Sequence, residues 1–281
     1  EQAKKAAEER LEAAKALPAA YLRDVFPSSE DELPEGWKWV KLGDVAIKLV
    51  DGTHHSPENS EEGNFMYVTS KNIRDFGLDL DDISYADEEV HKEIYKRCNP
   101  EKGDILYVKD GVNTGTVAMN TLDEEFSMLS SVALIKLPES ISNDFMLWVL
   151  KSPRFIQGIR EQMDGNAITR VTLKKLKACL IPLPPIEEQK RIAAILNEQM
   201  ATVEKAKKAA EERLEAAKAL PAAYLRDVFP DSEDELPAGW KWVKLGDVAE
   251  IARGGSPRPI DVYLTDSEDG VNWVKISDAT A

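Results

Sequence analysis

The sequence has few cysteines, no long apolar run and no recognisable leader. Its two cysteines, Cys98 and Cys179, are too few for a disulfide framework and lie in no CxxC pair, so buried thiols are expected. No apolar stretch approaches the roughly 18 residues that a membrane span needs. No basic-then-apolar segment opens the chain. These absences favour a globular protein of the cytoplasm that has no membrane partner.

Basic residues are also in short supply. The 281 residues include 36 Lys and Arg against 51 Asp and Glu, which gives a net charge of −15. This balance argues against a nucleic-acid partner, because neutralising phosphates requires Lys and Arg. The distribution of charge matters more than its sum, and residues 151–177 carry seven Lys and Arg against two acids. The sequence therefore still allows binding to DNA.

Motifs for catalysis and for metal binding are missing as well. Gly254 and Gly255 are not followed by the Lys-Ser/Thr of a phosphate-binding loop. No Asn-Pro-Pro-aromatic segment is present, as an amino-methyltransferase would place against a flipped base. The histidines are His54, His55 and His91, and the adjacent pair lacks the i, i+4 spacing of a helical metal site. The sequence predicts no catalytic residues, no metal site and no bound cofactor.

A long internal repeat is the most informative feature that is present. Residues 1–46 return as residues 204–249 with three differences, at positions 2/205, 28/231 and 35/238. The offset of 203 residues is far longer than the period of a solenoid or propeller. Two near-identical copies around unrelated sequence predict a framework that flanks a variable module.

The sequence from residue 186 onward predicts a long helix with a narrow apolar stripe. Strong helix formers continue to residue 220 without Gly or Pro, and Pro221 should end or kink the helix. Spacings of three, four and seven indicate a coiled-coil seam rather than the broad face of a globular helix. The predicted seam consists of Ile192, Leu196, Val203, Ala206, Ala210, Leu214 and Ala217.

The module between the copies mixes strands and helices. Alternation or short apolar runs predict strands at residues 37–42, 65–68, 104–108 and 132–137. Helices are predicted from Asn143 and Asp144, which can cap one through residue 150, from Pro153 through residue 163, and after Thr172. The predicted class is α+β, a globular domain joined to long antiparallel coiled-coil helices.

Four polar loops of the module combine Gly or short hydroxyl residues with an amide, an imidazole or a cation. They span residues 51–57, 69–74, 109–116 and 165–170. Such groups read base edges and grip phosphates, although ordinary solvated turns have the same composition. The candidate DNA contacts are His54, Lys71, Asn72, Arg74, Lys109, Asn113, Thr114, Asn166, Thr169 and Arg170.

The order of several motifs resembles the specificity subunit of type I restriction-modification systems. The motifs are IPLPPIEEQKRIAAIL, an alanine-rich helix, ALPAAYLRDVF and LPxGWKWVKLGDVA. Residues 51–57 and 102–107 also resemble parts of that family's target recognition domains. In this family two recognition domains alternate with two conserved helical regions, and each recognition domain reads one half of a bipartite DNA site.

The resemblance implies a division of the chain and a set of partners. Residues 1–26 would be part of one conserved helical region, 34–185 a target recognition domain, 186–229 the conserved coiled-coil helix, and 236–281 the start of a second, truncated recognition domain. The implied partners are double-stranded DNA, modification subunits and a restriction subunit. S-adenosylmethionine, Mg and ATP would belong to those subunits, and the chain could also self-associate through its helices.

Two other interpretations remain at this stage. A coiled-coil adaptor would use its globular domain to bind protein, and its acidic surface would suit basic partners. A chain of this kind could also be the recognition half of a fused restriction-methylation enzyme. A continuous positive face formed by the four loops would favour DNA over the adaptor.

Overall fold

A computed structural model describes residues 2–27, 32–161, 170–230 and 235–252, together with residues 255, 258–265, 267 and 269. The candidate contacts Asn166 and Thr169 lie outside these described residues. The chain divides into two compact units, Glu1–Leu220 and Pro221–Ala281. The first unit holds the sheets and the helix pair, and the predicted α+β class is confirmed.

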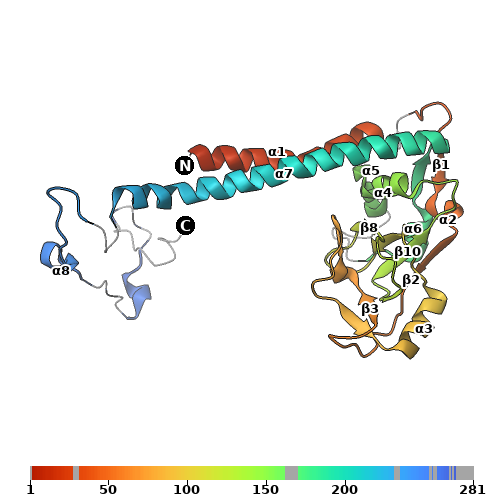
Figure 1. Ribbon diagram of the computed structural model, residues 1–281, viewed down its shortest axis with the longest axis horizontal. Helices are drawn as coiled ribbons and strands as arrows, with labels where there is room; N and C mark the ends of the chain where they lie inside the picture. The colour runs from red at the N-terminus through yellow and green to blue at the C-terminus, as the bar shows by residue number, and fades with distance from the viewer. Residues whose placement is uncertain are drawn as a thin grey trace. The chain divides into compact units, whose positions relative to one another are not determined.

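Two helices of the first unit pack side by side. α1 (Gln2–Val25) and α7 (Ile186–Val228) lie antiparallel, with the start of α7 beside the end of α1 (Figure 1). Their buried side chains are mostly Ala and Leu, which allow close approach. Pro221 was predicted to end or kink the helix, and it does not end it, because α7 continues to Val228, just as α1 continues past Pro18.

The seam of α7 follows a slightly different path from the predicted one. Ala206 is exposed, whereas Met200 is buried and Lys207 is half-buried. A stripe through residues 196, 200, 203, 207, 210, 214 and 217 alternates steps of four and three, which keeps one helix face toward the partner. The methylene stem of Lys207 covers the seam at its position while the ammonium group reaches Glu204 at 3.6 Å. Of the predicted positions, Ile192, Leu196, Val203 and Ala210 are buried, and Leu214 and Ala217 are half-buried.

The globular part is built on several small sheets. Among the described residues β3 and β9 run parallel, and the other paired strands run antiparallel. The largest sheet has the order β2 (Lys48–Asp51), β10 (Val132–Lys136), β7 (Ile105–Val108), β8 (Val117–Met119). A three-stranded sheet has the order β6 (Ser84–Ala86), β3 (Phe65–Val68), β9 (Phe126–Met128). Two further sheets have two strands each: β1 (Lys38–Lys41) with β11 (Leu180–Leu183), and β4 (Ile73–Arg74) with β5 (Gly77–Leu78).

The largest sheet is buried on both faces. Side chains alternate along a strand, so Ile105 and Tyr107 of β7 enter one apolar cluster, while Leu106 and Val108 enter another. The first cluster also contains Leu22 at the end of α1 and the apolar faces of α4 (Asn143–Lys151) and α5 (Pro153–Glu161). This packing joins the helix pair to the globular part.

Hydroxyl side chains cap the starts of α4 and α6 (Leu173–Ala178). The cap of α4 is Ser142, whose Oγ accepts a hydrogen bond from the amide of Phe145, and not Asn143 or Asp144 as predicted. α6 begins after Thr172, whose side chain accepts from the amide of Lys175, as predicted. The short helices α2 (Leu42–Val45) and α8 (Leu245–Val248) are the same sequence in the two copies of the repeat. α3 (Glu88–Arg97) was not predicted.

Candidate nucleic-acid interface

A buried carboxylate at the end of β2 gathers three positively charged or titratable side chains. Asp51 is 3% exposed, and its Oδ1 lies 2.5 Å from Arg97 Nη2 and 3.4 Å from His54 Nε2. Its Oδ2 lies 3.5 Å from the Nζ of Lys109, which is 2% exposed. A buried charge is tolerated only when it is paired in this way. Asp51 therefore orients His54 and Arg97, both half-exposed, at one edge of the domain.

The same ion-pair network reaches the loop at residues 109–116 and the chain at Arg170. Lys109 Nζ lies 2.7 Å from Asp110 Oδ2, and Arg170 Nε lies 3.2 Å from Asp110 Oδ1. The amide of Val171 donates to the Lys109 carbonyl at 2.7 Å. The loops at 51–57 and 109–116 thus meet Arg170 through one set of charges, and the guanidinium of Arg170 is two-thirds exposed.

Gly52 lets the loop at residues 51–57 pack closely against the backbone of residues 128–130. The amide of Thr53 donates to the carbonyl of Met128, and the amide of Ser130 donates to the carbonyl of Thr53, both at 2.8 Å. A Cβ at position 52 would stand 1.9 Å from the Met128 carbonyl oxygen. The loop that carries His54 therefore requires glycine at this position.

The remaining predicted loop lies beside the one at 109–116. The side-chain amide of Asn113 donates to the carbonyl of Ser70 at 3.4 Å. Lys71 pairs with Asp82 at 2.8 Å and Arg74 pairs with Asp79 at 3.4 Å, and both cations are partly exposed. Thr114 caps its own turn by donating to the carbonyl of Gly111 at 2.6 Å.

Two of the candidate DNA contacts are buried and have structural roles. Lys109 is enclosed by Asp51 and Asp110. Asn72 is 1% exposed; its side chain accepts from the amide of Thr69 and donates to the carbonyl of Asp79. Both residues were selected from composition alone, and in the described conformation they hold loops in place without facing solvent.

Arg97 was missed from the sequence because α3 was not recognised. The helix begins with Glu88 and Glu89 and ends with Lys96 and Arg97, the charge order that complements a helix dipole. This order of charges in residues 88–97 was the sequence feature that could have predicted the helix. It would have identified the helix without showing that Arg97 reaches Asp51.

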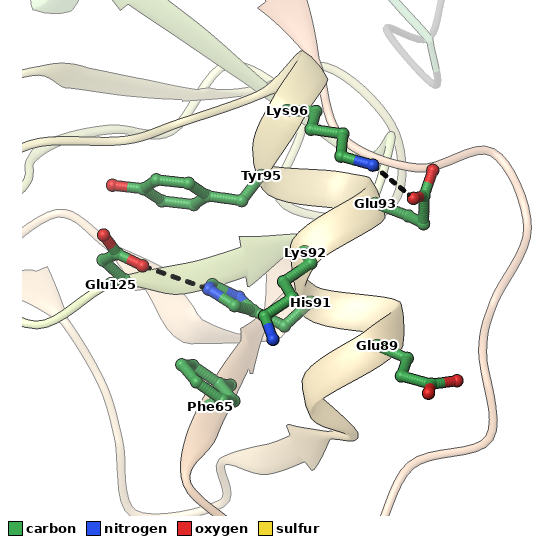
Figure 2. Close-up of a pocket in the computed structure, with 8 residues that line it drawn as sticks. All are labelled: Phe65, Glu89, His91, Lys92, Glu93, Tyr95, Lys96 and Glu125. Atoms are coloured by element: carbon green, nitrogen blue, oxygen red, sulfur yellow. Dashed lines mark hydrogen bonds and ion pairs between the residues drawn. The ribbon is translucent and has the colours of Figure 1, made fainter.

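A pocket of about 570 Å³ lies along α3 (Figure 2). His91, 2% exposed, stacks on Phe65 with ring centroids 4.0 Å apart. Its Nδ1 is 3.1 Å from Ser127 Oγ and its Nε2 is 3.3 Å from Glu125 Oε2. Although a Ser, a His and a Glu are aligned, Ser127 is 0% exposed and cannot meet a substrate. The contact of His91 with Ser127 instead holds α3 against β9, and its stacking on Phe65 holds α3 against β3. The remaining lining residues are Glu89, Lys92, Glu93, Tyr95 and Lys96.

Metal-binding clusters and membrane-spanning helices are both absent from the described residues. In that part of the chain no group of three His, Cys, Asp or Glu side chains is placed to hold a metal ion. No helix there is both long enough and apolar enough to cross a membrane.

Comparison with known proteins assigns the chain to a family. A family model described as the type I restriction modification DNA specificity domain matches residues 34–215. The MjaVIII type I restriction enzyme specificity subunit of Methanocaldococcus jannaschii is 30% identical over 258 residues, which cover 87% of this chain and 55% of that protein. The EcoAI type I restriction enzyme specificity subunit of Escherichia coli is 26% identical over 181 residues, which cover 63% of this chain and 30% of that protein. This chain thus spans little more than half the length of the first relative.

Solved structures show the same fold. A chain from a study of complex assembly and conformational transition in a type I restriction-modification system matches with a TM-score of 0.65 and 24% identity, over 80% of this chain and 53% of its own. The HsdS subunit of Thermoanaerobacter tengcongensis matches with a TM-score of 0.57 and 23% identity, over 81% of this chain and 53% of its own. The resemblance first indicated by the repeat and its flanking motifs is confirmed: the chain belongs to the family of type I restriction-modification DNA specificity proteins.

Proposed function

We propose that the chain is a DNA-sequence specificity subunit, or half of one, that reads one half of a bipartite site for a type I restriction-modification complex. The observation that carries the proposal is the convergence of His54, Arg97 and Arg170 on the charge network around Asp51. His54 comes from the loop after β2, Arg97 from the end of α3 and Arg170 from the chain before α6. Cations fixed in this way can grip phosphates while neighbouring amides read base edges.

The acidic chain is compatible with this role because the cations are held in exchangeable pairs. Lys71, Arg74 and Arg170 each pair with a carboxylate at a partly exposed site. Such surface pairs are worth about 0–1 kcal/mol. A phosphate can therefore replace the carboxylate at small cost, while the carboxylates limit binding to DNA of the wrong sequence.

The division of labour predicted from the motifs forms part of the proposal. Residues 34–185 would be the recognition domain, residues 1–26 and 186–229 the helical regions, and residues 236–281 the start of a second recognition domain. Modification subunits would supply methyl transfer with S-adenosylmethionine, and a restriction subunit would supply ATP- and Mg-dependent cleavage. This chain would supply no catalytic group, and the complex would work in the cytoplasm.

Selection from random DNA tests the proposal. The full chain, co-expressed with a modification subunit encoded beside it, is incubated with a pool of random duplexes, and bound DNA is sequenced. The proposal expects one enriched motif. Enrichment of none, from a complex that nevertheless forms, would contradict the proposal and favour a protein-binding adaptor.

A pair of variants tests the interface itself. Arg170→Ala should weaken binding to the enriched duplex and reduce the slope of log K against log salt by about 0.9, the value of one phosphate contact. Lys92→Ala removes a cation paired with Glu88 on the exposed side of α3 and is the matched control. An unchanged slope for Arg170→Ala, or an equal change for Lys92→Ala, would remove Arg170 from the interface.

We also propose that the chain can self-associate through its helices. In the first copy of the repeat Leu22 and Phe26 are each 3% exposed, whereas in the second copy Leu225 is 58% and Phe229 is 56% exposed. Apolar side chains that pack in one copy are thus available in the other. Light scattering of the complex should show mass increasing with concentration, and Leu225→Glu should suppress it. A monomer at every concentration would contradict self-association.

A further inference from the structure

The most exposed large apolar side chain in the described part of residues 2–220 belongs to Val112, at 102%. It lies in residues 109–116, which join the antiparallel strands β7 and β8 as the tip of a hairpin. Exposed apolar side chains are common on proteins. This one differs because it lies at the centre of a predicted DNA-binding loop and because the loop holds it outward.

Backbone hydrogen bonds fix the shape of the tip. The amide of Gly115 donates to the Val108 carbonyl at 2.8 Å, and the amide of Thr114 donates to the Gly111 carbonyl at 3.1 Å. Gly111 and Gly115 have φ of +104° and +100°, values that L side chains rarely adopt. These bonds and backbone angles shape the turn that presents the side chain of Val112 to solvent.

Charged and polar contacts flank the tip on both sides. Before it, Asp110 pairs with Arg170 at 3.2 Å. After it, Asn113 bonds to the carbonyl of Ser70, next to Lys71. An apolar apex between two cations matches the profile of a DNA groove, where phosphates line the rims and base edges form the floor.

The width of the element selects the major groove. A two-stranded β-ribbon fits the major groove, about 12 Å wide, and is too broad for the minor groove, about 6 Å wide. The apolar group on the major-groove floor is the C5-methyl of thymine, which aliphatic side chains contact in direct readout. We propose that the β7–β8 hairpin enters the major groove and that Val112 specifies a thymine by contact with this methyl group. The inference rests on the proposed DNA-recognition function and deepens it.

Replacement of thymine by uracil provides a test, because it removes that methyl group and no hydrogen-bonding atom. The enriched duplex is prepared with uracil at each thymine in turn and titrated with the full chain in complex with its modification subunit. One substitution should weaken binding by wild type about fourfold, the factor that burying one methyl group is worth. Val112→Ala should lose a similar factor on the thymine duplex and little more on the uracil duplex.

Matched controls separate this contact from general effects. Ile47 is 70% exposed in the same unit, and Ile47→Ala should keep the full sensitivity to uracil. Two results would overturn the inference while leaving sequence-specific binding intact. In the first, wild type binds every uracil-substituted duplex as tightly as the thymine duplex. In the second, Val112→Ala loses as much affinity on the uracil duplex as on the thymine duplex, so that the two losses are independent. Failure of wild type to enrich any motif would instead remove the proposed function, and this inference with it.

Discussion

The internal repeat allows one substitution to be tested in two environments with the same local sequence. Phe26 and Phe229 are equivalent residues within the same ALPAAYLRDVF segment. Phe26 is 3% exposed and packs edge-on against Phe145, with ring centroids 5.7 Å apart. Phe229 is 56% exposed and has Trp240 at 6.1 Å. Local helix propensity is therefore matched, and only the tertiary contacts differ.

Phe26→Ala should destabilise the first unit strongly, and Phe229→Ala should not. Removing a buried Phe costs about 3–5 kcal/mol, whereas a surface change with one ring contact costs about 1 kcal/mol or less. With a urea dependence of about 2–3 kcal/mol per molar, Phe26→Ala should lower the unfolding midpoint by about 1–2 M. The midpoint is measured by far-ultraviolet circular dichroism and by tryptophan fluorescence.

Equal shifts for the two variants would refute the packing of α1 against the globular domain, since that packing is the only difference invoked. Each titration is run at two protein concentrations. A shift for Phe229→Ala that grows with concentration would indicate that Phe229 is buried between chains, as the self-association proposal expects.

Three further substitutions or reagents probe the domain. Asp82→Asn frees Lys71 from its 2.8 Å ion pair. Affinity for random DNA should therefore rise about twofold to fivefold, with a steeper salt dependence. Weaker binding of the variant in a filter-binding assay would contradict this. Gly52→Ala should destabilise by about 1–3 kcal/mol, because its Cβ would stand 1.9 Å from the Met128 carbonyl oxygen, and an unchanged melting temperature would disprove the close approach. Burial raises the pKa of Cys98 to about 12, so at pH 8 only about one thiol in ten thousand is ionised and a disulfide reagent should label Cys98 only after unfolding. Rapid labelling of the native protein at Cys98 would be inconsistent with that burial.

Several segments of this chain were predictable from the sequence, and some of their ends were not. The strands at residues 65–68 and 132–137 and the helix from residue 186 carry their signal in local alternation and composition. The cap of α4 is Ser142 rather than Asn143 or Asp144, and α7 continues through Pro221 along residues whose side chains are exposed, so neither end follows from apolar periodicity. The strands β8 and β9 were missed because each has three residues, too few to show a period.

Part of the candidate site could be predicted from the sequence, and part could not. Its loops could be identified individually, since Gly, amides and cations in a polar segment are visible in the sequence. Their meeting at Asp51 could not, because it depends on β2, β7 and α3 coming together across the fold. For that reason Lys109 was expected at the surface and is buried, and Arg97 was not expected at all.

The repeat itself separates what the sequence determines from what the fold decides. LGDV forms a short helix in both copies, α2 and α8, because its hydrogen bonds close within a few residues. KWVK forms strand β1 at residues 38–41, where Leu180–Leu183 pairs with it, and is not a strand at residues 241–244. Leu42 is 0% exposed and its equivalent Leu245 is 66% exposed. The sequence alone therefore determined the long helix and the family, whereas strand pairing and burial required partners distant in the chain, which only the tertiary structure supplies.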